Sequence, residues 1–256
     1  ASGSGKSTFL DLVAGFILPN SGEILIDGKK NTNLSKWREK ISYVSQNIFL
    51  TDESIKDNIT FGNQKEFDDE LYLKSINNSN AAEFIEKLEK GSDTIVGEYG
   101  SKFSGGQRQR VSIARTLIMK PKFVVCDEPT SMLDVSIRIS IMDLMLNLAK
   151  DLEVSYLYIT HDLAVARYMC DRIAVMFNGK IVEIAETEEL LNNPIHPYTK
   201  RLISSIPIPD PTYKRETYEI NFQELDSLLA ENPNSVEMIE VNPDHFVGTH
   251  DVKGLL

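Results

Sequence analysis

Residues 1–8 read ASGSGKST, and this stretch decides what kind of fold the chain can have. A nucleoside-triphosphate P-loop reads G-x-x-x-x-G-K-[ST], and Gly5, Lys6 and Ser7 fill its last three places. The first glycine of the pattern would stand one position before Ala1. Because a β-strand usually runs into such a loop, the stretch also raises the question of what lies upstream of it.

The remaining letters of the loop carry the chemistry of phosphate binding. Gly3 and Gly5 let successive backbone N–H groups curl around one anion. Lys6 can reach the outer phosphates as a point charge, and the hydroxyl of Ser7 can bind Mg²⁺. Residues 7–16, STFLDLVAGF, are predicted to form a helix whose positive N-terminal end points at the phosphates. A Gly/Ser turn that merely precedes a lysine is the alternative interpretation.

Length, charge and cysteine content limit the class of protein. With 256 residues and 41% hydrophobic content, the chain can bury a sizeable core in one or two domains. No run approaches the ~18–20 apolar residues of a transmembrane helix. The net charge of −11 argues against non-specific binding to nucleic acid. Cys126 and Cys170 are too few for a disulfide framework, and Cys126 is predicted to be a small buried hydrophobe.

Strands and helices alternate along the chain. Strands are predicted at residues 23–28, 40–46, 122–128 and 154–162, and a hairpin at residues 171–185 that turns at Asn178-Gly179. Helices are predicted within residues 53–88, at 108–118 and at 135–150, where Ile137, Ile141, Leu144 and Leu148 share one face. This alternation predicts an α/β fold with a mainly parallel sheet.

Two acids end the apolar run KFVVCDE at residues 122–128. In a parallel sheet the ligand crevice lies at the carboxyl ends of the strands. Asp127 can hold Mg²⁺ there, usually through water, and Glu128 can accept a proton from an attacking water molecule. A lone acid pair after a strand is usually a solvated loop, but downstream of a P-loop it indicates a nucleotide site.

The most specific stretch is KFSGGQRQRVSIAR, which begins at residue 102. Its Ser-Gly-Gly sequence is predicted to begin a helix, whose N-terminal end can form a second anion-binding site. The alternative interpretation is an ordinary serine N-cap followed by flexible glycines. FSGGQ followed by RQR resembles the signature sequence of the ATP-binding cassette family, the motor subunits of ABC transporters, and the resemblance covers residues 1–206. It implies that two cassettes sandwich two ATP molecules. The signature of one cassette then contacts ATP held by the other through Ser104, Gly105, Gly106 and Gln107.

The resemblance implies roles for the other motif residues. ATP would be held by Ser2, Gly3, Ser4, Gly5, Lys6, Ser7 and Thr8. Gln46 in YVSQN matches the Q-loop glutamine, which senses Mg²⁺ and the attacking water and couples to the membrane subunit; by itself, such a glutamine is most often a surface residue. Asp134 in SMLD matches the D-loop, and His161 in ITHD matches the switch histidine of the γ-phosphate. The implied Mg²⁺ ligands are Ser7, Gln46 and Asp127, and the implied catalytic residues for ATP hydrolysis are Glu128, His161 and Gln46.

The implied fold is the P-loop NTPase cassette: a mainly parallel sheet flanked by helices, with a helical subdomain and the remnant of an antiparallel β subdomain. Residues 1–206 would form the cassette. Its RecA-like core would take residues 1–46 and 119–206, and its helical subdomain about 47–118. Residues 207–256 would form an acidic C-terminal extension.

Two resemblances point to different directions of transport. Residues 83–107 resemble exporter cassettes, with Glu98 at the acid that contacts the coupling helices of the membrane domain. Residues 131–138, 160–183 and 192–211, the last of which include HPYT at 196–199, resemble the oligopeptide/dipeptide importer ATPases. By itself HPYT is typical of a helix start with proline at the first position. Because several consecutive segments agree, we interpret the chain as a peptide-import ATPase; export of another substrate, or a soluble cassette protein of translation or DNA repair, are the alternatives.

The implied partners are transmembrane permease subunits, a second identical or different cassette and a solute-binding protein, at the cytoplasmic face of the cell membrane. No nucleic acid is expected. Residues 207–256 hold 10 acidic and 3 basic residues, a net charge of −7 that is interpreted as solvated surface. Within them we predict a linker at 209–216, a short helix at 222–231 and a strand at 241–250. Because this tail has no cysteine, we predict no iron–sulfur or zinc site in it.

The family pattern places a core strand, and a β subdomain with an aromatic residue that stacks on adenine, before the P-loop. A buried strand with three or four large apolar side chains contributes on the order of 5–10 kcal/mol, compared with ~5–15 kcal/mol for a whole domain. We therefore expect the 256-residue chain by itself to be marginally stable or unfolded and to bind ATP poorly, and its longer parent to be an active motor. A cooperative thermal melt with ordinary stabilisation by ATP would contradict this expectation.

Overall fold

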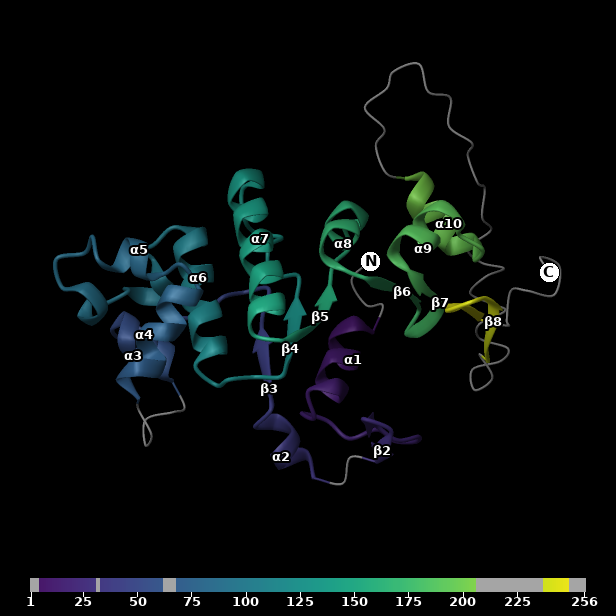
Figure 1. Ribbon diagram of the computed structural model, residues 1–256, viewed down its shortest axis with the longest axis horizontal. Helices are drawn as coiled ribbons and strands as arrows, with labels where there is room; N and C mark the ends of the chain where they lie inside the picture. The colour runs from purple at the N-terminus through teal and green to yellow at the C-terminus, as the bar shows by residue number, and fades with distance from the viewer. Residues whose placement is uncertain (1–4, 31–32, 62–67, 206–236, 249–256) are drawn as a thin grey trace, which may run out of the picture. The chain divides into compact units, whose positions relative to one another are not determined.

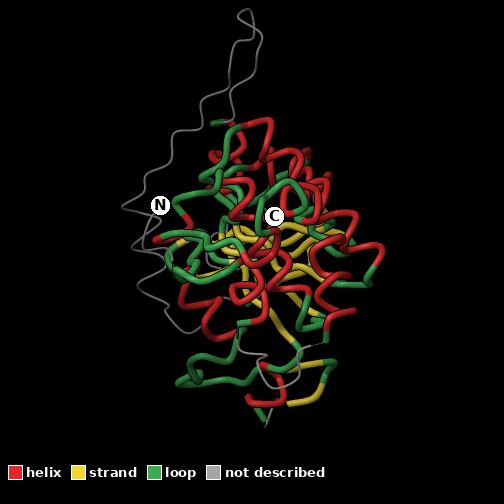
Figure 2. Tube along the Cα trace, turned by 90° about the vertical axis from the view of Figure 1, so that its left-hand side faces the viewer, coloured by secondary structure: helices red, strands yellow, loops and turns green. Residues whose placement is uncertain are grey.

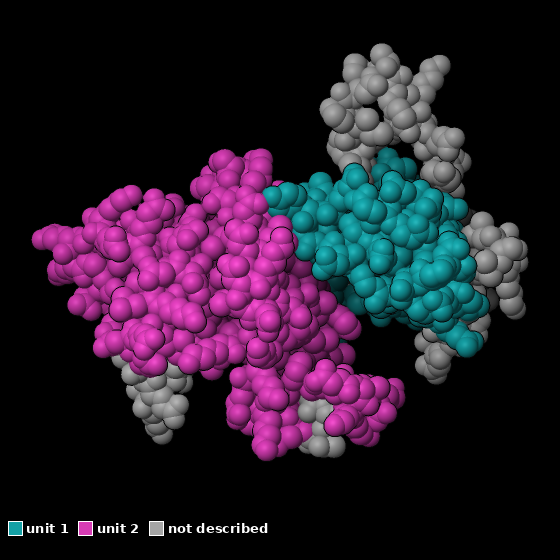
Figure 3. All heavy atoms as spheres, in the orientation of Figure 1, with its two compact units in different colours: residues 1–8, 160–256 teal, residues 9–159 magenta. Residues whose placement is uncertain are grey.

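The computed structural model describes residues 5–30, 33–61, 68–205 and 237–248. The chain divides into two compact units (Figure 3): residues 9–159, called the 9–159 unit, and residues 1–8 with 160–256, called the C-terminal unit. Each unit is described by itself, and Figure 2 traces the helices and strands of both.

A parallel sheet forms the centre of the 9–159 unit. Its strands, in spatial order, are β3 (Ile41–Val44), β4 (Phe123–Asp127) and β5 (Ser155–Ile159) (Figure 1). The register pairs Asp127 with Ile159, so the carboxyl ends of β4 and β5 lie at the same edge. Val124, Val125 and Cys126 are at most 1% exposed, as expected for a strand buried on both faces. The predicted strands, their parallel arrangement and the buried Cys126 are confirmed.

The helix predicted at residues 7–16 is α1 (Lys6–Val13), which ends shortly before Gly15 with φ of 73°. The strand and turn predicted at 23–28 form a small hairpin of β1 (Leu25–Ile26) and β2 (Lys29–Lys30). Helix α2 (Leu34–Arg38) carries Trp37, whose indole N–H donates to the carbonyl of Val13 at 2.7 Å. Its ring packs 6.0 Å from Phe123 of β4, which joins α2 to the sheet.

Helices fill the chain between β3 and β4. They are α3 (Ile55–Thr60), α4 (Asp69–Asn78), α5 (Ala82–Ile85) and α6 (Gly105–Leu117), with 3-10 turns at Gly91–Asp93 and Glu98–Gly100. Their common core contains Leu50, Ile55, Ile59, Tyr72, Ile76, Ile85, Val96, Phe103, Val111 and Ile118. The helical pattern predicted at 53–88 and the amphipathic helix predicted at 108–118 are confirmed. This core packs α6 against α3 and α4, so the first turn of α6 has a firm support.

Helix α7 (Val135–Asp151) follows β4 in the chain. It buries Ile141, Leu144 and Leu148, three residues of the apolar face predicted from the helical period. The fourth, Ile137, is half-buried and lies next to the first turn of α6. The helix predicted at 135–150 is therefore confirmed, and it packs the N-terminal end of α6.

The C-terminal unit contains an antiparallel sheet. Its strands, in spatial order, are β6 (Arg172–Phe177), β7 (Lys180–Glu186), β9 (His245–Gly248) and β8 (Met238–Asn242). Asn178 and Gly179 join β6 to β7 with φ of 45° and 76°, the left-handed pair that a type I′ turn requires. The predicted hairpin is confirmed.

Three helices pack on this sheet: α8 (Leu163–Met169), α9 (Thr187–Asn192) and α10 (Pro197–Ser204). His196 caps α10, and its Nδ1 accepts from the backbone N–H of Tyr198 at 3.1 Å. Pro197 is the first helical residue, so HPYT is the helix start that its letters predict. The Tyr198 ring lies 4.4 Å from Phe177 of β6, which holds α10 on the sheet.

The prediction of one continuous strand at residues 241–250 is wrong. The structure has a hairpin in which β8 ends at Asn242 and β9 begins at His245. Pro243 has no N–H to donate to a ladder, and Asp244 adopts φ of 58°, so the two residues turn the chain. Strand β9 then pairs with β7. The predicted linker at 209–216 and helix at 222–231 lie outside the described residues.

Candidate functional site

The acids that end β4 are held in different ways. Asp127 is the last residue of the strand, and its Oδ2 accepts from the hydroxyl of Tyr43 on β3 at 3.3 Å. Burial, and next the charge of Asp127, raise the pKa of Tyr43 to about 12. The hydroxyl therefore keeps its proton at physiological pH and remains a donor that orients the Asp127 carboxylate.

Glu128 leaves the strand through a left-handed backbone with φ of 45°. Such a conformation is strained for a residue with a side chain and persists only where the surroundings impose it. Here the N–H of Glu128 donates to the carbonyl of Ile159 at 3.0 Å, which continues the β4–β5 ladder by one bond. The ladder thus fixes the main chain at Glu128.

Gln46 lies two residues beyond the end of β3 and reaches the loop after β4. Its Nε2 donates to the hydroxyl of Ser131 at 3.4 Å, and that hydroxyl donates to the carbonyl of Glu128 at 2.9 Å. The structure therefore brings Gln46, Asp127 and Glu128 together at one edge of the sheet. Ser131, which matched only the start of the D-loop in the sequence, connects two of them.

The first turn of α6 contains the signature, residues 104–107. Ser104 and Gln107 form a capping box, in which each side chain bonds the other residue's backbone N–H, at 3.3 Å and 2.9 Å. A Cβ on Gly106 would lie 2.8 Å from Ile137, and one on Gly105 would lie 3.0 Å from Leu133. The two glycines thus let α6 pack closely on the start of α7, a role that the sequence did not indicate.

Asp134 caps α7 with its backbone and is exposed, with no capping hydrogen bond from its side chain. Large apolar side chains close to it in the sequence are also exposed: Met132, Val135 and Ile139 are 69%, 70% and 46% exposed. The signature and the D-loop therefore belong to one packed corner of the 9–159 unit that presents both polar and apolar groups to solvent.

The C-terminal unit carries the other predicted site residues. Gly5 adopts φ of 84°, a left-handed conformation that favours glycine, and Lys6, Ser7 and Thr8 form the start of α1. His161 is exposed and precedes Asp162, whose carboxylate caps α8. Ser2, Gly3 and Ser4 lie outside the described residues.

An aromatic surface lies on the helical part of the 9–159 unit. Phe49, Phe61 and Tyr99, called the aromatic patch, are 58%, 62% and 66% exposed. The rings of Phe49 and Tyr99 lie edge to face, 6.2 Å apart. Glu98, the acid singled out in the exporter-like segment, precedes Tyr99 in the same 3-10 turn. The patch begins three residues after Gln46.

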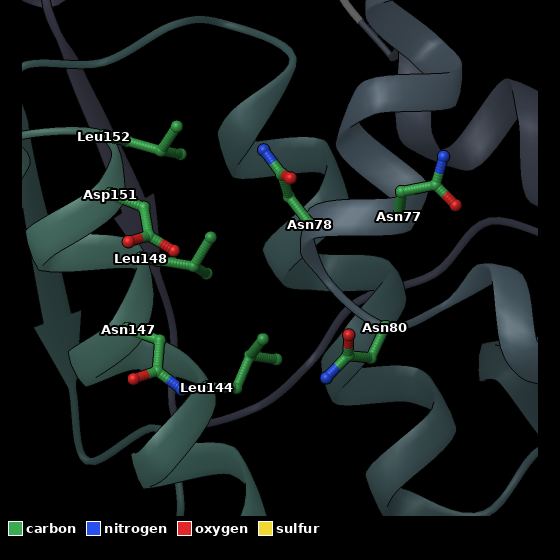
Figure 4. Close-up of a pocket in the computed structure, with 8 residues that line it drawn as sticks. All are labelled: Asn77, Asn78, Asn80, Leu144, Asn147, Leu148, Asp151 and Leu152. Carbon is green, nitrogen blue, oxygen red and sulfur yellow. The ribbon is translucent and has the colours of Figure 1, made fainter.

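A shallow cavity of about 270 Å³ lies between the end of α4 and the second half of α7 (Figure 4). Its lining residues are Asn77, Asn78, Asn80, Leu144, Asn147, Leu148, Asp151 and Leu152. None of the predicted site residues lines it, so it is separate from the edge of the sheet that carries Asp127 and Glu128. Among the described residues, no helix combines the length and apolar character needed to cross a membrane.

Sequence reasoning missed Tyr43 and Ser131. A tyrosine inside a strand offers one signal, because a buried hydroxyl usually finds a partner. Which partner it finds depends on the β3–β4 register, which pairs Tyr43 with Val125 and brings its hydroxyl within reach of Asp127.

Comparisons with known proteins bear on both parts of the chain. The family model described as "ABC transporter" matches residues 1–131, and the one described as "Oligopeptide/dipeptide transporter, C-terminal region" matches residues 182–231. The chain is 38% identical to the oligopeptide transport ATP-binding protein AmiF of Streptococcus pneumoniae serotype 4, with 96% of this chain and 81% of the relative aligned. Identity and coverage are the same for OppF of Streptococcus pyogenes serotype M1.

A putative peptide import ATP-binding protein of Brucella ovis is 38% identical over 84% of this chain and 69% of its own length. Among solved structures, a bacterial Atm1-family ABC exporter with ATP bound is similar to this chain with a TM-score of 0.67 and 33% identity. That similarity covers 76% of this chain and 34% of the exporter, so the chain spans about a third of the exporter's length.

Proposed function

The chain belongs to the ABC transporter family, and from that premise we propose that it is the ATP-hydrolysing subunit of a transporter that imports oligopeptides or dipeptides. The match of residues 182–231 to the peptide-transporter C-terminal region carries this proposal. Relatives named for oligopeptide transport and peptide import support it over most of the chain. The likeness to an exporter does not favour export, because it covers only about a third of that protein.

ATP would be bound by the P-loop, with Lys6 and the N-terminal end of α1 offsetting the phosphate charge. Ser7, Gln46 and Asp127 offer a hydroxyl, an amide carbonyl and a carboxylate, which are the oxygen ligands that Mg²⁺ takes. A bound Mg²⁺ would neutralise charge on the phosphates. The Tyr43 hydroxyl, bonded to Asp127 at 3.3 Å, would keep that carboxylate in one orientation.

Glu128 would accept the proton of the attacking water, and His161 would hold the γ-phosphate. The fixed main chain at Glu128 supports this role, because a general base needs a defined position. Gln46 is bonded to Ser131, which in turn bonds the carbonyl of Glu128. A displacement of Gln46 would therefore also displace the main chain at Glu128, the proposed base.

A second cassette would complete the site through its own signature and D-loop. The surface around Asp134 supports this arrangement, because Met132 and Val135 are each about two-thirds exposed or more. Apolar side chains of this size gather at interfaces more often than on free surfaces. The second cassette can be a copy of this chain or a homologue.

The aromatic patch would dock on the membrane-spanning permease subunits, which places the protein at the cytoplasmic face of the membrane. Exposed aromatic residues are enriched in the cores of protein interfaces. The acid of Glu98 adds a polar contact beside Tyr99. A solute-binding protein on the opposite face would deliver peptide to the permease.

The proposal predicts ATP-dependent peptide uptake by the assembled transporter. The full-length protein would be co-expressed with the permease genes that neighbour its own gene, purified through a tag on this subunit and placed in proteoliposomes. We expect hydrophobic permease subunits to co-purify, and labelled trialanine to accumulate only when ATP is present on the cassette side. Labelled peptide moving away from the cassette side would indicate an exporter, and co-purification with ribosomes would indicate a soluble cassette protein.

A further inference from the structure

Arg115 joins the signature helix to the chain segment that follows Gln46. It lies on α6, ten residues after Gly105, which is ~15 Å along the helix at 1.5 Å per residue. Its Nε donates to the carbonyl of Asn58 at 2.7 Å, and its Nη1 donates to the carbonyl of Phe49 at 2.9 Å. Its Nη2 donates to the side-chain oxygen of Asn58 at 3.1 Å. One guanidinium therefore holds two separate segments.

Asn58 extends this hold to the residues after Phe49. It is 1% exposed, and its Oδ1 accepts from the backbone N–H of Thr51 at 2.9 Å. Its Nδ2 donates to the carbonyls of Thr51 and Ser54, both at 3.0 Å. The chain from Phe49 to Ser54 is thus held by hydrogen bonds to one arginine and one asparagine.

Arg115 also contacts the aromatic patch directly. The guanidinium carbon lies 6.0 Å from the centre of the Phe61 ring, within the range of a cation–π contact. Phe49, whose carbonyl it binds, packs its own ring on Tyr99. Burial lowers the pKa of Arg115, but an arginine stays charged at physiological pH. The charged guanidinium therefore lies beside the Phe61 ring and bonds the main chain at Phe49.

We propose that Arg115 is a positioning residue that makes the aromatic patch move with α6, and so couples contact of the signature with ATP to the permease. This inference rests on the proposed function. A force on Ser104 or Gln107 acts at the end of a helix that is supported along its length, so the displacement reaches Arg115. There the planar guanidinium would pass the displacement to Phe49, through its bond to that carbonyl, and to Phe61, through the ring contact.

The lysine variant tests this role because it keeps the charge and loses the fork. Lysine offers a compact ammonium in place of the planar donors that reach Asn58 and Phe49 at once. We expect Arg115→Lys to leave the KM for ATP and the basal hydrolysis of the full-length protein within twofold of wild type. In the transporter assembled with its native permease, we expect two quantities to fall about fivefold or more, the usual scale of coupling between sites. They are the stimulation of ATP hydrolysis by the permease and the amount of labelled trialanine transported per ATP hydrolysed.

The matched control is Arg110→Lys on the same helix, because the Arg110 Nη2 donates to the hydroxyl of Ser140 at 3.1 Å and belongs to neither the patch nor the Asn58 network. It should change neither basal hydrolysis nor coupling. If Arg115→Lys lowers basal and stimulated hydrolysis by the same factor, the arginine is merely structural and the proposal is overturned. Unchanged coupling overturns it as well.

If Arg115→Lys does not fold, Arg115→Gln is the second variant. Glutamine keeps one side-chain amide that can bond a main-chain carbonyl, but it loses the planar fork that reaches Asn58 and Phe49 at once. Reduced coupling with normal basal hydrolysis supports the proposal, and normal coupling overturns it. If the wild-type protein recruits no permease, the proposed function itself is wrong. If the wild type and the variant both couple hydrolysis to transport equally well, only the role of Arg115 is wrong.

Discussion

Replacing Glu128 with glutamine is expected to reduce ATP hydrolysis by ~10²–10⁴-fold, the usual contribution of a general base. Glutamine has the shape of glutamate and keeps its hydrogen-bonding oxygen, but it cannot accept the proton of the attacking water. ATP binding should survive, so the ATP-bound dimer should accumulate. Single-turnover hydrolysis and size-exclusion chromatography with ATP, both on the full-length protein, measure the two effects.

Glu153 provides a matched control for this substitution. It belongs to the same unit, is exposed and has a left-handed backbone with φ of 52°, close to the 45° of Glu128. Glu153→Gln should therefore report any effect of the amide on such a backbone without touching the proposed site. Wild-type turnover in Glu128→Gln would remove Glu128 from the role of base.

Much of the fold follows from local patterns in the sequence. The apolar run before Asp127 indicates a strand buried on both faces, and Asn178-Gly179 indicates a tight hairpin, because each depends on neighbouring residues only. The order of the motifs along the chain likewise identifies the family. These signals needed no knowledge of which strands lie side by side.

Contacts between distant segments could not be predicted in this way. The bond from Tyr43 to Asp127 crosses 84 positions and depends on the register of two strands. The packing of Gly106 on Ile137 gives that glycine a steric role beside the anion nest that its letters suggested. The sequence predicts one strand where the structure has a hairpin, because the turn at Pro243 and Asp244 is only two residues long. The pairing of β9 with β7 could not be predicted either, because β7 lies far earlier in the chain.

His245 shows the same limit, because its partners lie on elements more than fifty residues earlier in the chain. It is completely buried on β9, and its Nε2 lies 2.8 Å from Oε1 of Glu183, a residue of β7 that is also completely buried. Its Nδ1 lies 3.2 Å from Oε1 of Glu189. Both imidazole nitrogens therefore lie within hydrogen-bonding distance of a carboxylate oxygen.

Glu183 also supports the start of α10. Its Oε1 accepts from the N–H of Ile195 at 2.8 Å, and its Oε2 accepts from the N–H of His196 at 3.1 Å. One buried carboxylate therefore joins β7, the HPYT helix start and the tail hairpin. The match to the peptide-transporter C-terminal region ends at residue 231, before His245, so the hairpin extends this joint beyond the matched segment.

Replacing His245 with leucine is expected to destabilise the docked hairpin by ~1–3 kcal/mol, because it removes the imidazole that lies within hydrogen-bonding distance of the buried Glu183 carboxylate. Hydrogen exchange of the β7 and β9 amides in the full-length protein measures this loss, since the amides that pair Glu183 with Val247 and Ile184 with Phe246 would open.

Asp244→Asn in the same hairpin is the control, because Asp244 is exposed and asparagine also accepts its left-handed backbone. Adding Glu183→Gln to His245→Leu should restore part of the protection, because no charge is then left buried. Equal exchange in wild type and His245→Leu would mean that strand pairing alone holds the hairpin, and the buried pair would then have no part in attaching the tail.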